Sequence, residues 1–224
     1  MSWFTKDFFT FFEGLKQNNT REWFSDNKKL YEKAVKAPFE ELVEDLINRI
    51  RVDNPGLDLQ PKDAIFRIHR DTRFSQNKDP YKTNVAANIS PVGRKSAETP
   101  GFYLHFGADE IMTGGGAYMV EKEGLRKIRT ALAEAPDEFD ALIADKAFKK
   151  KYGAIRGEKN KVIPAEFKEA YARQPLIANK QFYFMAELKP DVLLKKNLPE
   201  HLMEYYEAGR PMSSFLTNAL ARKG

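Results

Sequence analysis

The sequence contains no cysteine, only three histidines and no long run of hydrophobic residues. The absence of cysteine excludes a disulfide framework, a thiolate metal site and a cysteine nucleophile. Polar residues interrupt every apolar stretch within a few positions, so we expect neither a membrane-spanning helix nor a membrane partner. The N-terminal residues lack a basic region followed by an apolar block, so we expect no signal peptide. These absences favour a cytoplasmic protein.

Aromatic and charged residues, in contrast, are plentiful along the chain. The 17 Phe, 9 Tyr and 2 Trp supply enough apolar area for a substantial core, which argues against disorder. The formal charge of +5 permits attraction to anions, whether phosphorylated metabolites or nucleic acid. A net charge of this size does not choose between them, so the distribution of the charges matters more than their sum.

The hydrophobic pattern predicts helices, then strands, then helices. Residues 1–52 keep a period near 3.6, with Thr20 as an N-cap and Pro38 in the first turn of a later helix. Residues 62–120 form the strand region, and its short connections favour antiparallel pairing. Residues 121–224 are mainly helical. We therefore predict a single α+β domain over residues 1–224, with a mostly antiparallel sheet packed against N-terminal and C-terminal helices.

The individual elements follow from local signals. Strands are predicted at residues 64–71, 85–90, 102–107, 116–119 and 181–188. Gly114–Gly116 lacks the spacing of a nucleotide-binding loop, so we interpret it as a tight turn or a close backbone approach before a strand. A last helix over residues 199–220 is expected to break near Gly209–Pro211.

One basic segment, residues 67–84, stands out from the rest of the chain. It combines five cations and two aspartates with an imidazole and aromatic rings, namely Arg67, Arg70, Arg73, Lys78, Lys82, Asp71, Asp79, His69, Phe74 and Tyr81. If this segment begins as a strand, alternation places one set of side chains on a single face: Arg67, His69, Asp71 and Arg73. Phe66, Ile68 and Arg70 fall on the opposite face.

The same alternation extends this polar face to the other predicted strands. Its further members would be Asn84, Asn88, Tyr103, His105, Tyr183 and Glu187. Arginines bind phosphate or carboxylate through paired hydrogen bonds, and a histidine oriented by a carboxylate titrates near neutrality. We therefore predict His69 and Asp71 as a proton-transfer pair. The predicted ligand-binding residues are Arg67, Arg70, Arg73, Lys78, Tyr81, Lys82, Asn84, Tyr103 and His105. No metal-binding spacing is present, and no cofactor is indicated.

Three functions remain open at this level. We favour an anionic small molecule as the ligand, because Asp71, Asp79 and Glu187 would repel a polyanion. The second is a nucleic-acid module, in which the cations contact phosphates while Phe74 and Tyr81 stack on bases. The third is a structural or interaction protein, in which the segment is a network of ion pairs. The sequence alone decides neither whether the protein is an enzyme nor its oligomeric state.

The basic segment also resembles a known family. Residues 67–84 meet every fixed position of the pattern RxHRDxRFSxxKxPYKxN, which is typical of the family named domain of unknown function 2461. Residues 18–24, 101–103, 115–118 and 125–129 match that family as well. The resemblance covers nearly the whole chain and weakens after about residue 150. It implies a single full-length domain and brings no established activity, cofactor or catalytic residue.

Overall fold

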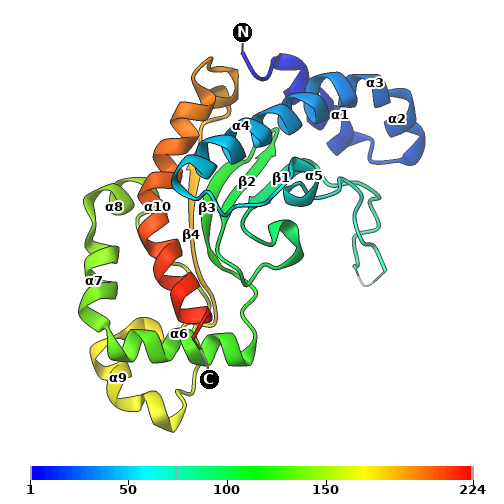
Figure 1. Cartoon of the computed structure of the whole chain (residues 1–224). Coiled ribbons are helices and arrows are strands. Elements are labelled where there is room, and N and C mark those ends of the chain that lie inside the picture. The colour runs from blue at the N-terminus through cyan, green and yellow to red at the C-terminus, as the bar shows by residue number, and fades with distance from the viewer. Residues whose placement is uncertain (1, 74, 223–224) are drawn as a thin grey trace. The chain divides into compact units, whose positions relative to one another are not determined.

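Four strands form one sheet, in the order β1-β2-β3-β4 (Figure 1). The computed structural model describes residues 2–73 and 75–222. The strands are β1 (Asn84–Ile89), β2 (Phe102–Gly107), β3 (Ile111–Ala117) and β4 (Phe182–Leu188). They pair antiparallel, and helices precede and follow them along the chain. The predicted α+β class with an antiparallel sheet is confirmed.

Helices occupy most of the remaining chain. The α-helices are α1 (Lys6–Gln17), α2 (Arg21–Asp26), α3 (Lys28–Tyr31), α4 (Ala37–Asp53), α5 (Pro61–Ala64), α6 (Lys122–Glu134), α7 (Pro136–Ala144), α8 (Lys146–Tyr152), α9 (Lys168–Arg173) and α10 (Leu198–Leu220). A π-helical stretch, Glu32–Lys36, joins α3 to α4. As predicted, the Thr20 side chain caps α2 by accepting from Trp23 N at 3.2 Å, and Pro38 lies in the first turn of α4. Within the described chain, no helix is both long and apolar enough to cross a bilayer.

The described chain divides into two compact units. Unit 1 comprises Met1–Arg94, Tyr103–Thr113 and Glu187–Met203. Unit 2 comprises Lys95–Phe102, Gly114–Ala186 and Glu204–Gly224. The strand β3 and the helix α10 each contribute residues to both units. The basic segment belongs entirely to unit 1.

The core of unit 1 lies where α1 and α4 cover one side of β1 and β2. The helix α1 buries four apolar residues at helical spacing: Phe8, Phe11, Phe12 and Leu15. The ring of Phe106 on β2 packs edge-on against Phe39 of α4 at 5.6 Å and against Phe4 at 6.1 Å between centroids. Leu104 is buried on the same strand face. This packing leaves the alternate residues of β2, Tyr103 and His105, on the opposite face.

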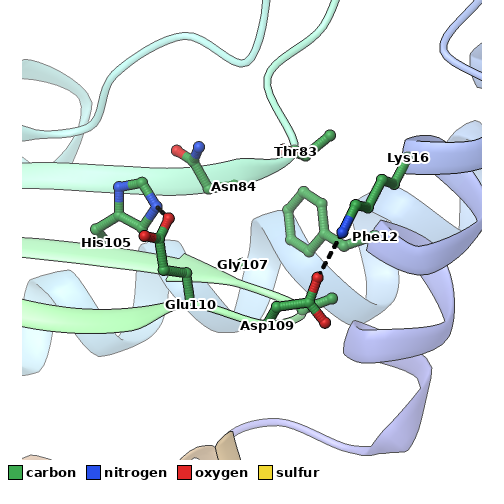
Figure 2. A pocket seen from close by; sticks show the side chains of 9 residues that line it. Phe12, Lys16, Thr83, Asn84, His105, Gly107, Asp109 and Glu110 are labelled. Atoms are coloured by element: carbon green, nitrogen blue, oxygen red, sulfur yellow. Dashed lines mark hydrogen bonds and ion pairs between the residues drawn. The ribbon is translucent and has the colours of Figure 1, made fainter. Parts of the chain in front are cut away.

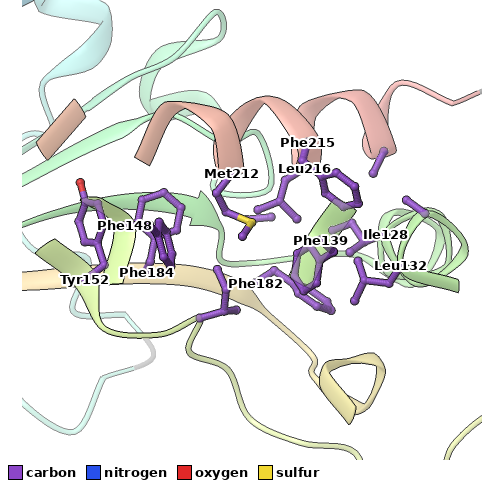
Figure 3. Packing of buried hydrophobic residues seen from close by; sticks show 14 of the residues in the cluster. Ile128, Leu132, Phe139, Phe148, Tyr152, Phe182, Phe184, Met212, Phe215 and Leu216 are labelled. Atoms are coloured by element: carbon purple, nitrogen blue, oxygen red, sulfur yellow. The ribbon is translucent and has the colours of Figure 1, made fainter. Parts of the chain in front are cut away.

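The core of unit 2 is a cluster of aromatic and aliphatic side chains from α6, α7, α8, β4 and α10 (Figure 3). Phe139 of α7 contacts Phe215 of α10 at 5.3 Å between ring centroids, and Phe148 of α8 contacts Phe184 of β4 at 5.2 Å. Gly209 brings α10 close to the sheet, since an added Cβ there would lie 2.6 Å from the Phe184 ring. The helix α10 is continuous from Leu198 to Leu220 with Pro211 inside it, so the break predicted near Gly209–Pro211 is wrong.

Two other local predictions need correction. The triple glycine, Gly114–Gly116, lies inside β3 and not in a turn, although the predicted close backbone approach is present. Gly116 has a φ of +97°, and an added Cβ would lie 2.3 Å from the Phe182 carbonyl oxygen. The predicted strand over residues 64–71 is also wrong. Pro61 starts the short helix α5, which takes up the first residue of that range.

Residues 65–70 nevertheless run antiparallel to residues 80–87 through two isolated bridges. Ile65 pairs with Ala87, and His69 pairs with Tyr81. Four residues separate the two bridge positions on the first segment (69 − 65), but six separate them on the second (87 − 81). The extra residues form a bulge that interrupts the ladder, so no continuous strand develops.

Candidate functional site

The basic segment is an irregular hairpin at the start of β1. Backbone hydrogen bonds from Phe66 N to Ala86 O (2.9 Å) and from Lys82 N to Ile68 O (2.8 Å) hold its two sides together. In Figure 1 the connecting residues 71–73 and 75–79 extend away from β1 and α5. The predicted alternation is present in the solvent exposure of the side chains. Ile68 is buried, whereas Arg67, His69, Asp71 and Arg73 are exposed.

Two charged residues of the hairpin loop, Arg73 and Asp71, pair with each other. Arg73 donates to Asp71 through Nε (3.0 Å to Oδ1) and through Nη2 (2.7 Å to Oδ2). These side-chain hydrogen bonds, with one from the Arg73 backbone, lower the pKa of Asp71 to about 2. Lys78 donates to the Thr72 carbonyl oxygen at 3.0 Å. The partner of Asp71 is therefore Arg73 and not His69, so the structure does not form the predicted His69–Asp71 pair.

His69 and Tyr81 anchor the hairpin to the N-terminal helices. Tyr81 stacks on Phe24 of α2 with ring centroids 4.0 Å apart and an interplanar angle of 12°. The His69 ring lies 5.1 Å from Tyr81 and 6.5 Å from Phe24. The Asn19 side chain donates to Tyr81 O (3.0 Å) and accepts from Tyr81 N (3.1 Å). These contacts give Tyr81, which is buried, a packing role. Phe74, the other ring predicted to stack on bases, lies outside the described residues.

Arg67, Arg70 and Lys82 form a group that we call the cation cluster. The Lys82 ammonium lies 5.4 Å from the centroid of the Phe66 ring. Its pKa is lowered, first by burial and then by the charges of Arg67 and Arg70. Across residues 2–73 and 75–222, no ion pair or side-chain hydrogen bond joins any of these three cations to a carboxylate. The cluster therefore gathers three positive charges without an ion pair among the described residues, and the carboxylate that Arg67 influences at longer range, Asp71, is paired with Arg73.

A cleft of about 340 Å³ is lined by Thr83 and Asn84, which directly follow Lys82 in the chain (Figure 2). Its walls come from α1, β1, β2 and the turn that joins β2 to β3. The lining residues are Phe12, Lys16, Thr83, Asn84, His105, Gly107, Ala108, Asp109 and Glu110. Lys16 and Asp109 form an ion pair of 2.7 Å at one end of the cleft. Our sequence reasoning missed Lys16, Asp109 and Glu110. The sequence signal that indicates the two acids is their position directly after the alternating residues 102–107. In the structure they lie in a turn that Gly107 N closes by donating to Glu110 O at 2.8 Å.

His105 is the titratable centre of the cleft. Only 15% of its side chain is exposed. Its Nε2 lies 3.5 Å from Glu110 Oε2, and its Nδ1 lies 3.4 Å from the Tyr103 hydroxyl. Burial lowers the pKa of His105, Glu110 opposes this shift and Lys82 adds to it. Because the ordinary pKa of histidine is about 6.5, the imidazole is neutral at pH 7.

The two groups of residues meet at Phe66. Its ring contacts Tyr103 edge-on at 6.4 Å between centroids and also carries the Lys82 ammonium. The structure thus brings together six of the predicted site residues: Arg67, Arg70, Lys82, Asn84, Tyr103 and His105. The other predicted residues have different direct partners: His69 and Tyr81 pack with Phe24, Asp71 pairs with Arg73, and Lys78 donates within the loop. The single polar face that we predicted is therefore divided.

The remaining members of that predicted face have other neighbours. Asn88 is buried and donates to the Gly93 carbonyl oxygen at 3.0 Å. Tyr183 belongs to unit 2, where its ring contacts Tyr118 at 5.1 Å. No group of three or more histidine and acidic side chains in the described part of the chain is placed to hold a metal ion.

The fold and the site define an α+β protein with a basic hairpin set beside a cleft at the edge of an antiparallel sheet. A family model described as "Conserved hypothetical protein (DUF2461)" matches residues 7–215. The chain therefore belongs to the DUF2461 family, as the pattern of residues 67–84 indicated. A comparison with curated proteins found no match.

Proposed function

We propose that the protein binds an anionic small molecule, bearing a phosphate or carboxylate group, at the cation cluster. The cleft beside it would hold the uncharged part of the ligand. The observation that carries this proposal is the grouping of Arg67, Arg70 and Lys82 with no ion pair or hydrogen bond to a carboxylate among the described residues. Arginine donates paired hydrogen bonds to phosphate and carboxylate, and lysine adds a point charge.

The electrostatics of Lys82 support a ligand and not a structural ion-pair network. Structural networks place cations beside anions, as Arg73 and Asp71 do in the same hairpin. In the cation cluster, burial and like charge both disfavour the ammonium of Lys82. A bound anion would remove this cost, so its binding free energy would include relief of the repulsion.

The acidic residues of the cleft favour a small ligand over a nucleic acid. Asp109 and Glu110 both line the cleft, and more than half of each side chain is exposed. Carboxylates at this position would repel the successive phosphates of a polyanion. A compact ligand with one anionic group can place that group at the cations and keep its hydroxyl or amine groups beside the acids.

The test measures the melting temperature of the full chain with sodium phosphate, pyrophosphate or citrate, against sodium chloride of equal ionic strength. We expect at least one multivalent anion to raise the melting temperature of the wild type. Arg67→Gln and Arg70→Gln should abolish this rise. Arg73→Gln is the matched control and should retain it, because Arg73 is already paired with Asp71.

Two results would contradict the proposal. One is a wild type that responds to none of the three anions, and the other is an equal loss of response in Arg70→Gln and Arg73→Gln. Binding of an oligonucleotide, weakening with salt by a slope of about one per phosphate contact, would support the nucleic-acid alternative in its place.

A further inference from the structure

We propose that Glu110, His105 and Tyr103 form a proton relay in which the Tyr103 hydroxyl is the terminal group. The relay would take a proton from a hydroxyl group of the anionic ligand. This inference rests on the proposed function only for the identity of that ligand. The relay itself is a property of β2 and of the turn that follows it.

The order of the three groups supports the relay. A carboxylate lies 3.5 Å from one imidazole nitrogen, and a phenol lies 3.4 Å from the other. One arrangement of protons satisfies both contacts at neutral pH. His105 donates from Nε2 to Glu110, and Tyr103 donates to the unprotonated Nδ1. A carboxylate that orients an imidazole, which in turn accepts from a hydroxyl, is the arrangement by which hydroxyl groups are activated in proteins.

The surroundings of His105 keep it ready to accept a proton. Two charged side chains act on it, Glu110 from the β2–β3 turn and Lys82 from the hairpin. Lys16 and Asp109 also line the cleft, but they neutralise each other in an ion pair. Burial keeps the imidazole uncharged, and Glu110 stabilises the imidazolium once it forms. A base of this kind accepts a proton transiently and can release it again.

The position of Tyr103 links the relay to the cation cluster. Its ring packs on Phe66, whose face carries the Lys82 ammonium. A ligand held by the cations would reach the phenol by extending past the Phe66 ring, which contacts both Lys82 and Tyr103. In the transfer, the ligand O–H bond breaks and a new O–H bond forms on Tyr103. The Tyr103 proton moves at the same time to His105 Nδ1, so the products are a ligand oxyanion and an imidazolium paired with Glu110.

The test uses the reaction of activated phenols with sulfonyl fluorides. The full chain is treated with 4-(fluorosulfonyl)benzoate, and the modified tyrosines are identified by peptide mass spectrometry. The phenol oxygen bonds to sulfur, fluoride leaves and the phenol proton passes to the imidazole. Among the 9 tyrosines, we expect Tyr103 to react at least about tenfold faster than Tyr118, which is the more exposed at 54%.

Two variants separate activation from accessibility. His105→Gln should lower the labelling rate of Tyr103 by about tenfold, and Glu110→Gln should lower it to a smaller extent, with Tyr118 unchanged. Glu110 is 66% exposed, so its variant is expected to fold even if His105→Gln does not. The melting temperature of each variant is measured alongside. Labelling of Tyr103 no faster than Tyr118, or unaffected by both substitutions, would overturn the relay.

An uncharged probe separates this proposal from the proposed function. Benzenesulfonyl fluoride carries the same arylsulfonyl fluoride group without the carboxylate. If the cation cluster does not bind anions, both probes should label Tyr103 equally, with the same dependence on His105. If the cluster binds anions and the relay is absent, Arg70→Gln should lower labelling by the benzoate probe only, and His105→Gln should leave both rates unchanged.

Discussion

Arg70 and Arg73 lie three positions apart in the same hairpin, yet they differ in their partners. Arg73 is paired with Asp71 by two side-chain hydrogen bonds, whereas Arg70 acts on Lys82 as a like charge. The difference arises because Asp71 lies two positions from Arg73, within hydrogen-bond distance of its guanidinium group. In the sequence, the two arginines carry the same charge. In the structure, Arg73 has a structural role in the loop, whereas Arg70 is available to bind an anion.

The lowered pKa of Lys82 leads to a prediction about the stability of the protein. Its pKa in the folded protein is below the unfolded value, so the unfolded state binds more protons in the pH range between the two. The charged ammonium therefore opposes folding at pH 7, and this cost is lost as the pH rises through that range. Lys82→Met keeps the apolar stem on Phe66 and removes the charge. We expect a gain of about 0.5 kcal/mol in unfolding free energy, small because solvent screens the half-exposed group.

Urea unfolding in low-salt buffer without multivalent anions measures this gain. Lys78→Met serves as the control, since Lys78 is exposed and donates only to the Thr72 carbonyl oxygen. A neutral surface substitution also falls within about 0.5 kcal/mol, so the two variants are compared by pH dependence: Lys78→Met should keep the rise in stability at alkaline pH that Lys82→Met removes. A loss of more than about 1 kcal/mol in Lys82→Met would show that Lys82 stabilises the apo protein and would favour the ion-pair network.

The pKa of His105 gives a second prediction. Its value in the folded protein is lowered, mainly by burial, so stability falls as the pH drops through the unfolded value of about 6.5 toward the folded one. Glu110→Gln removes the charge that opposes this shift. We therefore expect the pKa of His105 to fall further and the acid-side loss of stability to extend to lower pH.

An NMR titration of the imidazole resonances checks this expectation. Asp109→Asn is the matched control, because Asp109 pairs with Lys16 and not with His105. It should leave the titration of His105 nearly unchanged. An unchanged or raised pKa of His105 in Glu110→Gln would mean that the 3.5 Å contact does not persist in solution.

Among the elements, the strands with a clear alternation were predictable and the irregular ones were not. Residues 102–107 alternate strictly, and β2 has these bounds. The segment from residue 64 onward also alternates, but Pro61 initiates a helical turn before it and a bulge interrupts its pairing. No local sequence pattern predicts the bulge or the stacking of Tyr81 on Phe24, because both depend on contacts with other parts of the chain. For this reason, alternation placed His69 and His105 on one face, whereas the structure gives them different neighbours.

The glycine-rich strand β3 provides a prediction at the element scale. Gly116 combines a φ of +97° with a Cβ position 2.3 Å from the Phe182 carbonyl oxygen. Gly116→Ala should therefore cost more than about 2 kcal/mol in unfolding free energy, from both backbone strain and displacement of β4. Gly153→Ala is the control, since Gly153 has a φ of +77° but no atom within 4 Å of an added Cβ. Strain alone should cost about 1 kcal/mol.

Urea denaturation of both variants compares these costs directly. The comparison separates the two contributions, because Gly153 shares the positive φ and lacks the steric contact. Equal losses of unfolding free energy in the two variants would show that the close approach of β3 to β4 does not exclude a side chain at residue 116. Close packing of the two strands would then fail to explain why three consecutive glycines lie within β3.

For the whole molecule, composition and periodicity were enough to predict the α+β class, and the basic pattern was enough to predict the family. The division into two compact units was not predictable, because β3 and α10 are each continuous in sequence and contribute to both. The cleft was also missed. It combines α1, β1 and the β2–β3 turn, and only tertiary structure brings Lys16 next to Asp109.

The central claim is that Arg67, Arg70 and Lys82 bind an anion. X-ray diffraction from crystals of the full chain grown with sodium tungstate tests it most directly, since the anomalous signal of tungsten locates a phosphate-like anion without ambiguity. We predict the strongest peak in contact with the two guanidinium groups and the Lys82 ammonium, and its loss in Arg70→Gln. A strongest peak at another basic group, such as Lys149, Lys150 and Lys151 at the end of α8, or no peak at the cluster, would contradict the claim.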